Sequence, residues 1–198
     1  MTVRTSLVLV AFGFAGALAA QTTGPSFNAP YRAFASHEFG ATMAFPRGGG
    51  TQIEGQYRFG SGTFDVGMRG GIYFPGGVRD EEFVVGVEGR NRVLTHSETF
   101  PLDGALVFGA GARVNGGTFW QFPVGLSLGR RLTIEGSDIS IIPYVQPTGF
   151  LTASSGDTDF LFALGLGADF RLSSVFDARL SIGLGDMEGL AISAVWVR

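Results

Sequence analysis

The chain has 198 residues, a net charge of −3, only 16% charged residues and a mean hydropathy of +0.26. A soluble domain usually carries about a quarter charged residues, so this composition disfavours an ordinary soluble domain, and the lack of a basic run disfavours nucleic acid as a partner. Because the chain contains no cysteine, a disulfide framework and a thiolate metal site are excluded.

The N-terminus has the form of a secretory signal peptide. A short segment with Arg4 precedes an apolar stretch, residues 7–20, that ends in Ala-Leu-Ala-Ala. This stretch is too short for a comfortable membrane anchor, which needs about 20 apolar residues, whereas its small-residue end suits cleavage. We therefore expect residues 1–20 to be a cleaved signal peptide and residues 21–37 to be an irregular N-terminal leader.

From Glu38 onward, apolar side chains alternate with small, polar or charged ones, and clusters of Gly, Pro, Asn and Ser divide this pattern into segments of roughly ten residues. Pro143 and Pro147 interrupt one segment, and because proline lacks a ladder donor, eight strands remain an alternative to ten. The expected strands are residues 38–45, 52–59, 64–74, 83–90, 103–114, 118–131, 139–152, 159–172, 176–184 and 190–197.

The two faces of these strands differ in an unusual way. A period of two places alternate side chains on opposite faces; here one face is nearly all Phe, Leu, Val, Ile and Ala, and the other is padded with Gly, Ala and Ser. This pattern predicts an all-β fold, an antiparallel up-and-down transmembrane β-barrel over residues 38–198 with its apolar face toward lipid. The last strand should pair with the first near residues 39–45, because an open sheet edge in lipid would leave backbone groups unpaired.

Residues 38–198 resemble the small outer-membrane β-barrel proteins of Gram-negative envelopes, the porin-like superfamily of eight- to ten-stranded barrels. The resemblance rests on the alternation and on Tyr57, Trp120 and Trp196, which lie near strand ends where an aromatic girdle would sit. It implies an outer-membrane location, contact with lipid and lipopolysaccharide, and insertion by the barrel-assembly machinery. Members commonly end in Phe, whereas this chain ends Trp196-Val197-Arg198.

The inward face carries a balanced set of charges, which we expect to form ion pairs because an unpaired buried charge is strongly penalised. A barrel of about eight strands is mostly filled by its own side chains, so a packed polar lumen is favoured over an open, ion-selective pore. The predicted inward acids are Glu38, Glu54, Asp65, Glu88, Asp103, Asp169 and Asp177, and the predicted inward bases are Arg58, Arg69, Arg90, Arg113, Arg131, Arg171 and Arg179.

No catalytic, cofactor or metal site is expected. Residues 96–98 place a histidine, a serine and an acid side by side, but adjacent residues of an extended segment point in different directions and form no ready triad. His37 precedes the first strand, and Asp157 and Asp159 are too few for a cation site.

The sequence therefore predicts a structural role, or passage or binding of a small solute. Two alternatives remain: a barrel hydrolase that acts on lipid or peptide, as the lipid A deacylase and omptin types do, and a soluble secreted β-barrel that binds an apolar ligand. The sequence does not predict the oligomeric state.

Overall fold

The computed structural model of the protein describes residues 23–31, 37–115, 117–137 and 139–198, so the predicted signal peptide lies outside the described residues. Within this part of the chain no segment is α-helical, and no helix could cross a membrane. The strands are β1 (His37–Pro46), β2 (Thr51–Ser61), β3 (Phe64–Phe74), β4 (Glu82–Leu94), β5 (Asp103–Val114), β6 (Thr118–Gly129), β7 (Leu132–Thr133), β8 (Ser140–Ser154), β9 (Asp157–Ser173), β10 (Phe176–Gly185) and β11 (Gly189–Val197).

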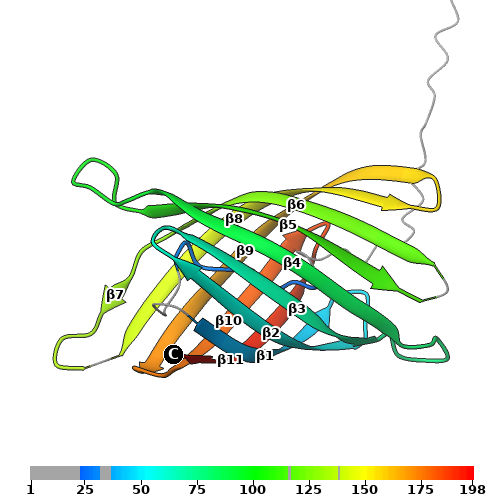
Figure 1. Ribbon diagram of the computed structural model, residues 1–198, viewed down its shortest axis with the longest axis horizontal. Helices are drawn as coiled ribbons and strands as arrows, with labels where there is room; N and C mark the ends of the chain where they lie inside the picture. The colour runs from blue at the N-terminus through cyan, green and yellow to red at the C-terminus, as the bar shows by residue number, and fades with distance from the viewer. Residues whose placement is uncertain (1–22, 32–36, 116, 138) are drawn as a thin grey trace, which may run out of the picture.

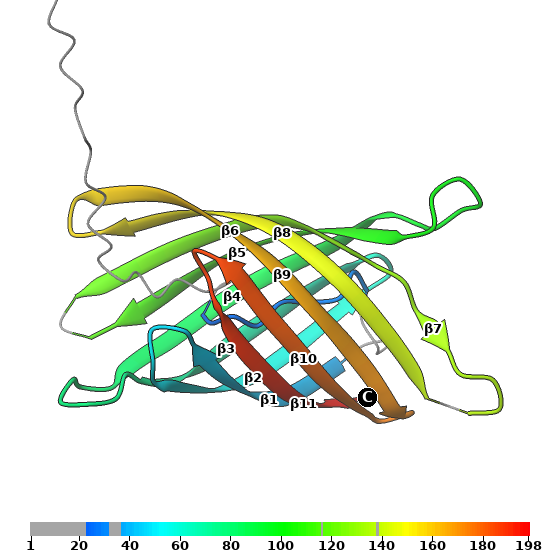
Figure 2. The same ribbon diagram turned by 180° about the vertical axis from the view of Figure 1, so that it is seen from behind.

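Ten of these strands form a closed antiparallel barrel, in which the strands lie strongly tilted (Figures 1 and 2). Consecutive strands pair, β6 pairs with β8, and β11 returns to β1 with Trp196 opposite Phe39. The two-residue strand β7 pairs only with the start of β8 and lies in the connection that projects from the barrel (Figure 1). The predictions of an all-β barrel, of ten strands and of first-to-last pairing are confirmed, and the eight-strand alternative is wrong.

Strand β8 forms despite its two prolines. Both prolines have the outward parity and keep their register with β9, with Pro143 opposite Ala168 and Pro147 opposite Leu164. The ladder between β6 and β8 is interrupted beside Pro147, where pairing stops at Thr148 and resumes at Val145. Since proline lacks an N–H group, the missing hydrogen bond is confined to one side of the strand.

The period-two pattern places each residue type on the expected face. On β3, Asp65 and Tyr73 are buried inside the barrel, whereas Phe64 and Met68 are exposed on its outer surface. Aromatic rings also meet on the outer surface: the ring of Trp196 stacks on Phe39 at 6.0 Å and meets the edge of another ring, Phe176, at 5.2 Å. An exposed apolar exterior around a buried polar interior is the inverse of a soluble protein, and it is typical of a transmembrane barrel.

The barrel has two distinct ends. The connections that follow β1, β3, β5, β8 and β10 lie at one end, which we call the turn end. There, β8 and β9 are joined through Ser155 and Gly156, which both have positive φ angles, 41° and 105°, as a two-residue hairpin turn requires. The other end, which we call the terminal end, contains His37, the C-terminal Arg198 and the longer connections 95–102 and 130–139.

Candidate functional site in the barrel lumen

The N-terminal segment 23–31 lies inside the barrel. Residues 23–30 are all buried, and Figures 1 and 2 show this segment, in dark blue, enclosed by the strands. The segment is irregular, as the sequence predicted for the leader, but its position in the lumen was not predicted.

The barrel wall binds the segment mainly through its backbone carbonyl groups. The donors are side chains from five different strands, β2, β4, β6, β8 and β10. Gln52 Nε2 donates to the carbonyl of Thr23 at 2.7 Å, Ser181 Oγ to Pro25 at 3.0 Å, the Tyr144 hydroxyl to Phe27 at 2.8 Å, Ser127 Oγ to Asn28 at 2.6 Å, and the Arg90 guanidinium to Ala29.

The segment also donates to the wall. The amide of Phe27 donates to Ser181 Oγ at 3.3 Å, and the amide of Asn28 donates to Gln146 Oε1 at 3.1 Å. The Asn28 side chain donates to Glu88 Oε1 at 3.0 Å. The segment is therefore held by buried hydrogen bonds on several sides, which fixes its path through the lumen.

The segment runs from the turn end toward the terminal end. Near the turn end, a Cβ atom built on Gly189 would lie 2.8 Å from the ring of Pro25. Near the terminal end, a Cβ atom on Gly129 would lie 3.2 Å from Pro30, and the Arg131 guanidinium lies 5.0 Å from the centre of the Tyr31 ring. Residues 23–31 thus span much of the barrel lumen.

Phe27 anchors the segment in an apolar part of the lumen. Its ring lies directly over Gly165, so that a Cβ atom there would clash with the ring, and a Cβ on Gly183 would come within 3.1 Å of it. Phe27 is 2% exposed and belongs to a buried cluster formed by the segment itself, β8, β9 and the turn that precedes β11; its other members are Ala29, Ile142, Tyr144, Phe150, Ala163 and Met187. The glycines therefore make room for a side chain that the barrel strands do not supply.

One group of buried ion pairs lies on β2, β3 and β4. Arg58 pairs with Asp65 and with Glu88, and Arg90 pairs with Asp65 at 3.0 Å. Arg69 lies 3.7 Å from the carboxylates of both Glu54 and Glu88. Glu88 also accepts the Asn28 hydrogen bond, so this group is joined to the lumen segment.

A second group surrounds Arg179 on β10. Its guanidinium forms a bidentate ion pair with Glu38, with both N–O distances 2.7 Å. Arg179 also lies 3.3 Å from Asp169 and 3.6 Å from Asp177, and all four side chains are nearly fully buried. Bidentate pairing of this kind is both strong and geometrically specific.

The remaining predicted lumen charges lie nearer the ends. Arg171 lies 3.4 Å from Asp177, and Arg113 lies 3.3 Å from Glu82, an acid that the sequence analysis did not place inside. The prediction that Arg131 lines the lumen is wrong: β6 ends at Gly129, and Arg131 is exposed at the terminal end. The other predicted charges, including Asp103, lie at inward positions of strands, where the structure brings most of them into direct pairs.

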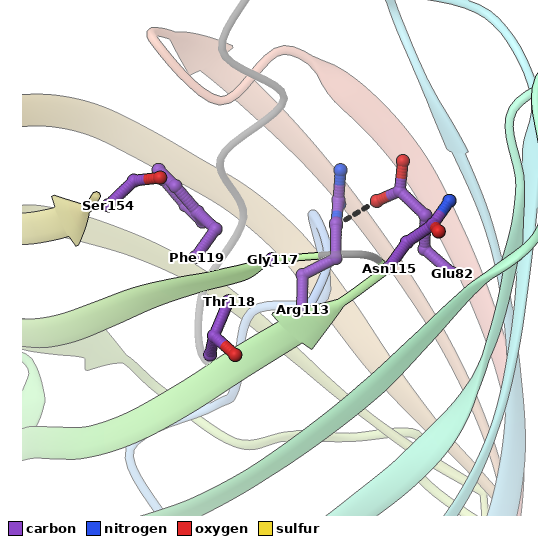
Figure 3. A pocket seen from close by; sticks show the side chains of 7 residues that line it. All are labelled: Glu82, Arg113, Asn115, Gly117, Thr118, Phe119 and Ser154. Atoms are coloured by element: carbon purple, nitrogen blue, oxygen red, sulfur yellow. Dashed lines mark ion pairs between the residues drawn. The ribbon is translucent and has the colours of Figure 1, made fainter.

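A pocket of about 220 Å³ opens at the turn end between β4, β5, β6 and β8. Figure 3 shows Arg113 and Glu82 next to each other on one side of the pocket, with their ion pair drawn as a dashed line and Ser154 and Phe119 on the other side. Its other lining residues are Asn115, Gly117, Thr118, Phe119 and Ser154.

Two of the residues weighed for catalysis, His96 and Ser97, contact different partners. His96 Nδ1 lies 3.0 Å from Asp103, whereas the Ser97 hydroxyl contacts Thr99 and the amide of Phe100. Among the described residues, no cluster of three or more His, Cys, Asp or Glu side chains could hold a metal ion.

Comparison with known proteins supports the fold. No family model matches the chain, and no curated protein matches its sequence. Among solved structures, the chain is similar to the β domain of the Bordetella autotransporter BrkA, with a TM-score of 0.53 and 13% sequence identity over 82% of this chain and 98% of that domain. The chain therefore shares the closed antiparallel β-barrel fold of that autotransporter β domain.

Proposed function

We propose that the protein is a non-enzymatic integral outer-membrane barrel with a structural role, and that its lumen is closed in the resting state. The observation that carries this proposal is the occupied lumen, in which residues 23–31 and the ion pairs of β2–β4 and β10 fill the interior together. A small solute would pass only after this segment moves.

The outer surface supports the membrane location. Large apolar side chains are exposed at mid-strand positions, such as Met68 at 51% and Val87 at 51%. Burial of this surface in lipid is favourable, whereas its exposure to water would promote association with other molecules. We also propose that the barrel-assembly machinery inserts the protein, since the C-terminal strand β11 keeps an outward Trp196.

The membrane location is tested by a charge on the outer surface. Met68→Arg, at the middle of β3, should reduce the free energy of unfolding in lipid vesicles by about 2–4 kcal/mol, and Phe74→Arg, at the end of the same strand, by about 0–1 kcal/mol. The measurement is urea unfolding followed by heat-modifiable gel migration. Equal effects at the two positions would contradict a lipid-facing strand.

Closure of the lumen is tested by recording in planar lipid bilayers. The wild-type protein should insert without steady conductance steps, because polar and apolar side chains block the interior. Steady steps from the purified wild-type protein would overturn the proposed closed state.

The absence of enzymatic activity is also testable. The pair of His96 with Asp103 is the arrangement closest to a general base in the described chain. His96→Ala should leave lipid A acyl content and peptide cleavage by whole cells unchanged, and a loss of either activity would replace the structural proposal with a hydrolase.

A further inference from the structure

We propose that the lumen wall is a binding site for an extended peptide with an aromatic residue between two prolines, and that residues 23–31 are the occupant that the chain itself supplies. This inference rests on the proposed closed lumen and adds a ligand class to it. An external peptide of the same pattern should bind when the internal occupant is weakened.

The wall recognises the segment as a backbone. Five carbonyl groups accept hydrogen bonds from wall side chains, and two amides donate to the wall. Among the described residues, the side-chain contribution is one hydrogen bond from Asn28 to the wall. Recognition through main-chain groups, with separate sites for particular side chains, is how proteins bind extended peptides.

Three side chains of the segment meet glycine positions of the wall. Pro25 lies over Gly189, Phe27 over Gly165 and Gly183, and Pro30 over Gly129. These contacts define two proline subsites on either side of one aromatic subsite. Prolines suit such a ligand because they restrict the free peptide and carry no N–H group that would need a partner.

The segment is not part of the barrel's own hydrogen-bonded sheet. Within the described residues, its backbone-to-backbone hydrogen bond is internal, from the amide of Ser26 to the carbonyl of Gly24. Every barrel strand is paired with strands on both sides without it. Departure of the segment therefore leaves the barrel ladders intact, so an occupant can exchange without unfolding.

The experiment uses the full-length chain with Phe27→Ala, which removes the buried ring and so weakens the internal occupant. The probe is a dye-labelled synthetic peptide of residues 21–31, titrated onto the detergent-folded protein and followed by fluorescence anisotropy. We expect saturable binding to Phe27→Ala, and binding to the wild-type protein at least about tenfold weaker, because its own segment competes.

Two controls isolate the aromatic subsite. The same peptide with alanine at the position of Phe27 should bind at least about tenfold more weakly, and a peptide of reversed sequence should not bind. In the double variant Phe27→Ala/Gly165→Leu, the leucine side chain occupies the aromatic subsite, so the variant should no longer bind the labelled peptide.

Absence of saturable binding to Phe27→Ala, or equal binding of the normal and reversed peptides, would overturn the peptide site. The proposed closed state is judged separately by the wild-type bilayer recording. A closed wild-type barrel that binds no peptide would leave the function standing and remove only this inference.

Discussion

The two sides of the lumen are filled in different ways. The side formed by β1 to β4, with β10 and the end of β9, is filled by its own arginine–carboxylate pairs, centred on Arg58 and Arg179. The side formed by β8 and by residues 161–167 of β9 has small or neutral inward residues, such as Gly165 and Gln146, and is filled by the separate segment 23–31. Long arginine side chains thus complete one side from within the strands, whereas glycines on the other side require an additional piece of chain.

The largest effect should come from the charged side. Arg179→Leu leaves Glu38, Asp169 and Asp177 buried without their shared cation, which should reduce the free energy of unfolding by about 3–5 kcal/mol. The measurement is urea unfolding in lipid vesicles, followed by tryptophan fluorescence.

The matched control for this arginine is Arg47→Leu. Arg47 also pairs with an acid, Glu188, but its side chain is 76% exposed, so the expected loss is below about 1 kcal/mol. A loss for Arg179→Leu as small as that for Arg47→Leu would show that the charged side does not stabilise the barrel through its ion pairs.

An intermediate effect should come from overpacking the neutral side. Gly165→Leu places a side chain where the Phe27 ring lies. We expect it to reduce the free energy of unfolding by about 1–3 kcal/mol and to displace segment 23–31 from the lumen. Asn28→Cys provides a single reporter thiol, because the chain has no cysteine of its own.

In the Asn28→Cys background the thiol should be protected from maleimide, since Asn28 is 3% exposed, and Gly165→Leu should make it reactive. Gly70→Leu is the matched control because Gly70 faces outward, where a Cβ atom would make only an ordinary contact with the carbonyl of Val84 at 3.8 Å, and it should leave the thiol protected. Unchanged protection of the thiol in Gly165→Leu would mean that the neutral side has room for both the leucine and the Phe27 ring. That result would contradict the view that segment 23–31 fills the neutral side.

The smallest effect should come from one hydrogen bond on the neutral side. Ser127→Ala removes the 2.6 Å bond to the carbonyl of Asn28, so the free energy that holds segment 23–31 in the lumen should fall by about 0.5–1.5 kcal/mol. Thiol labelling of Asn28→Cys should become faster without a change in the unfolding of the barrel. A large loss of barrel stability would show that the segment is required for the fold itself.

Much of the barrel could be predicted from the sequence because the alternation of inward and outward side chains is visible within each strand. Alternation alone places Met68 outside and Asp65 inside, and it survives in β8 because Pro143 and Pro147 share the outward parity. The pairing partners could not be predicted in this way. Glu38 and Arg179 are 141 positions apart, and parity states only that both point inward.

One error, at Arg131, and one feature that the sequence analysis missed, the position of segment 23–31, have physical causes. Arg131 follows an alternating run, but β6 stops at Gly129, so the parity that placed Arg131 inside no longer applies. Segment 23–31 has no periodicity and reads as a leader. The one signal that could have placed it is the crowding of inward glycines at Gly165, Gly167 and Gly183, which leaves more room than nearby side chains can fill.

The position of segment 23–31 ahead of β1 has a consequence for the order of folding. Its bonds to Ser181 join residues 154 and 156 positions apart, and the ring of strands closes only when β11 pairs with β1. Contacts of such large sequence separation form slowly, because most of the chain must lose conformational entropy before these contacts can stabilise it. The part of the described chain that is synthesised first is therefore among the last to find its native partners. The time at which the Asn28→Cys thiol becomes protected from maleimide would report when assembly of the barrel is complete.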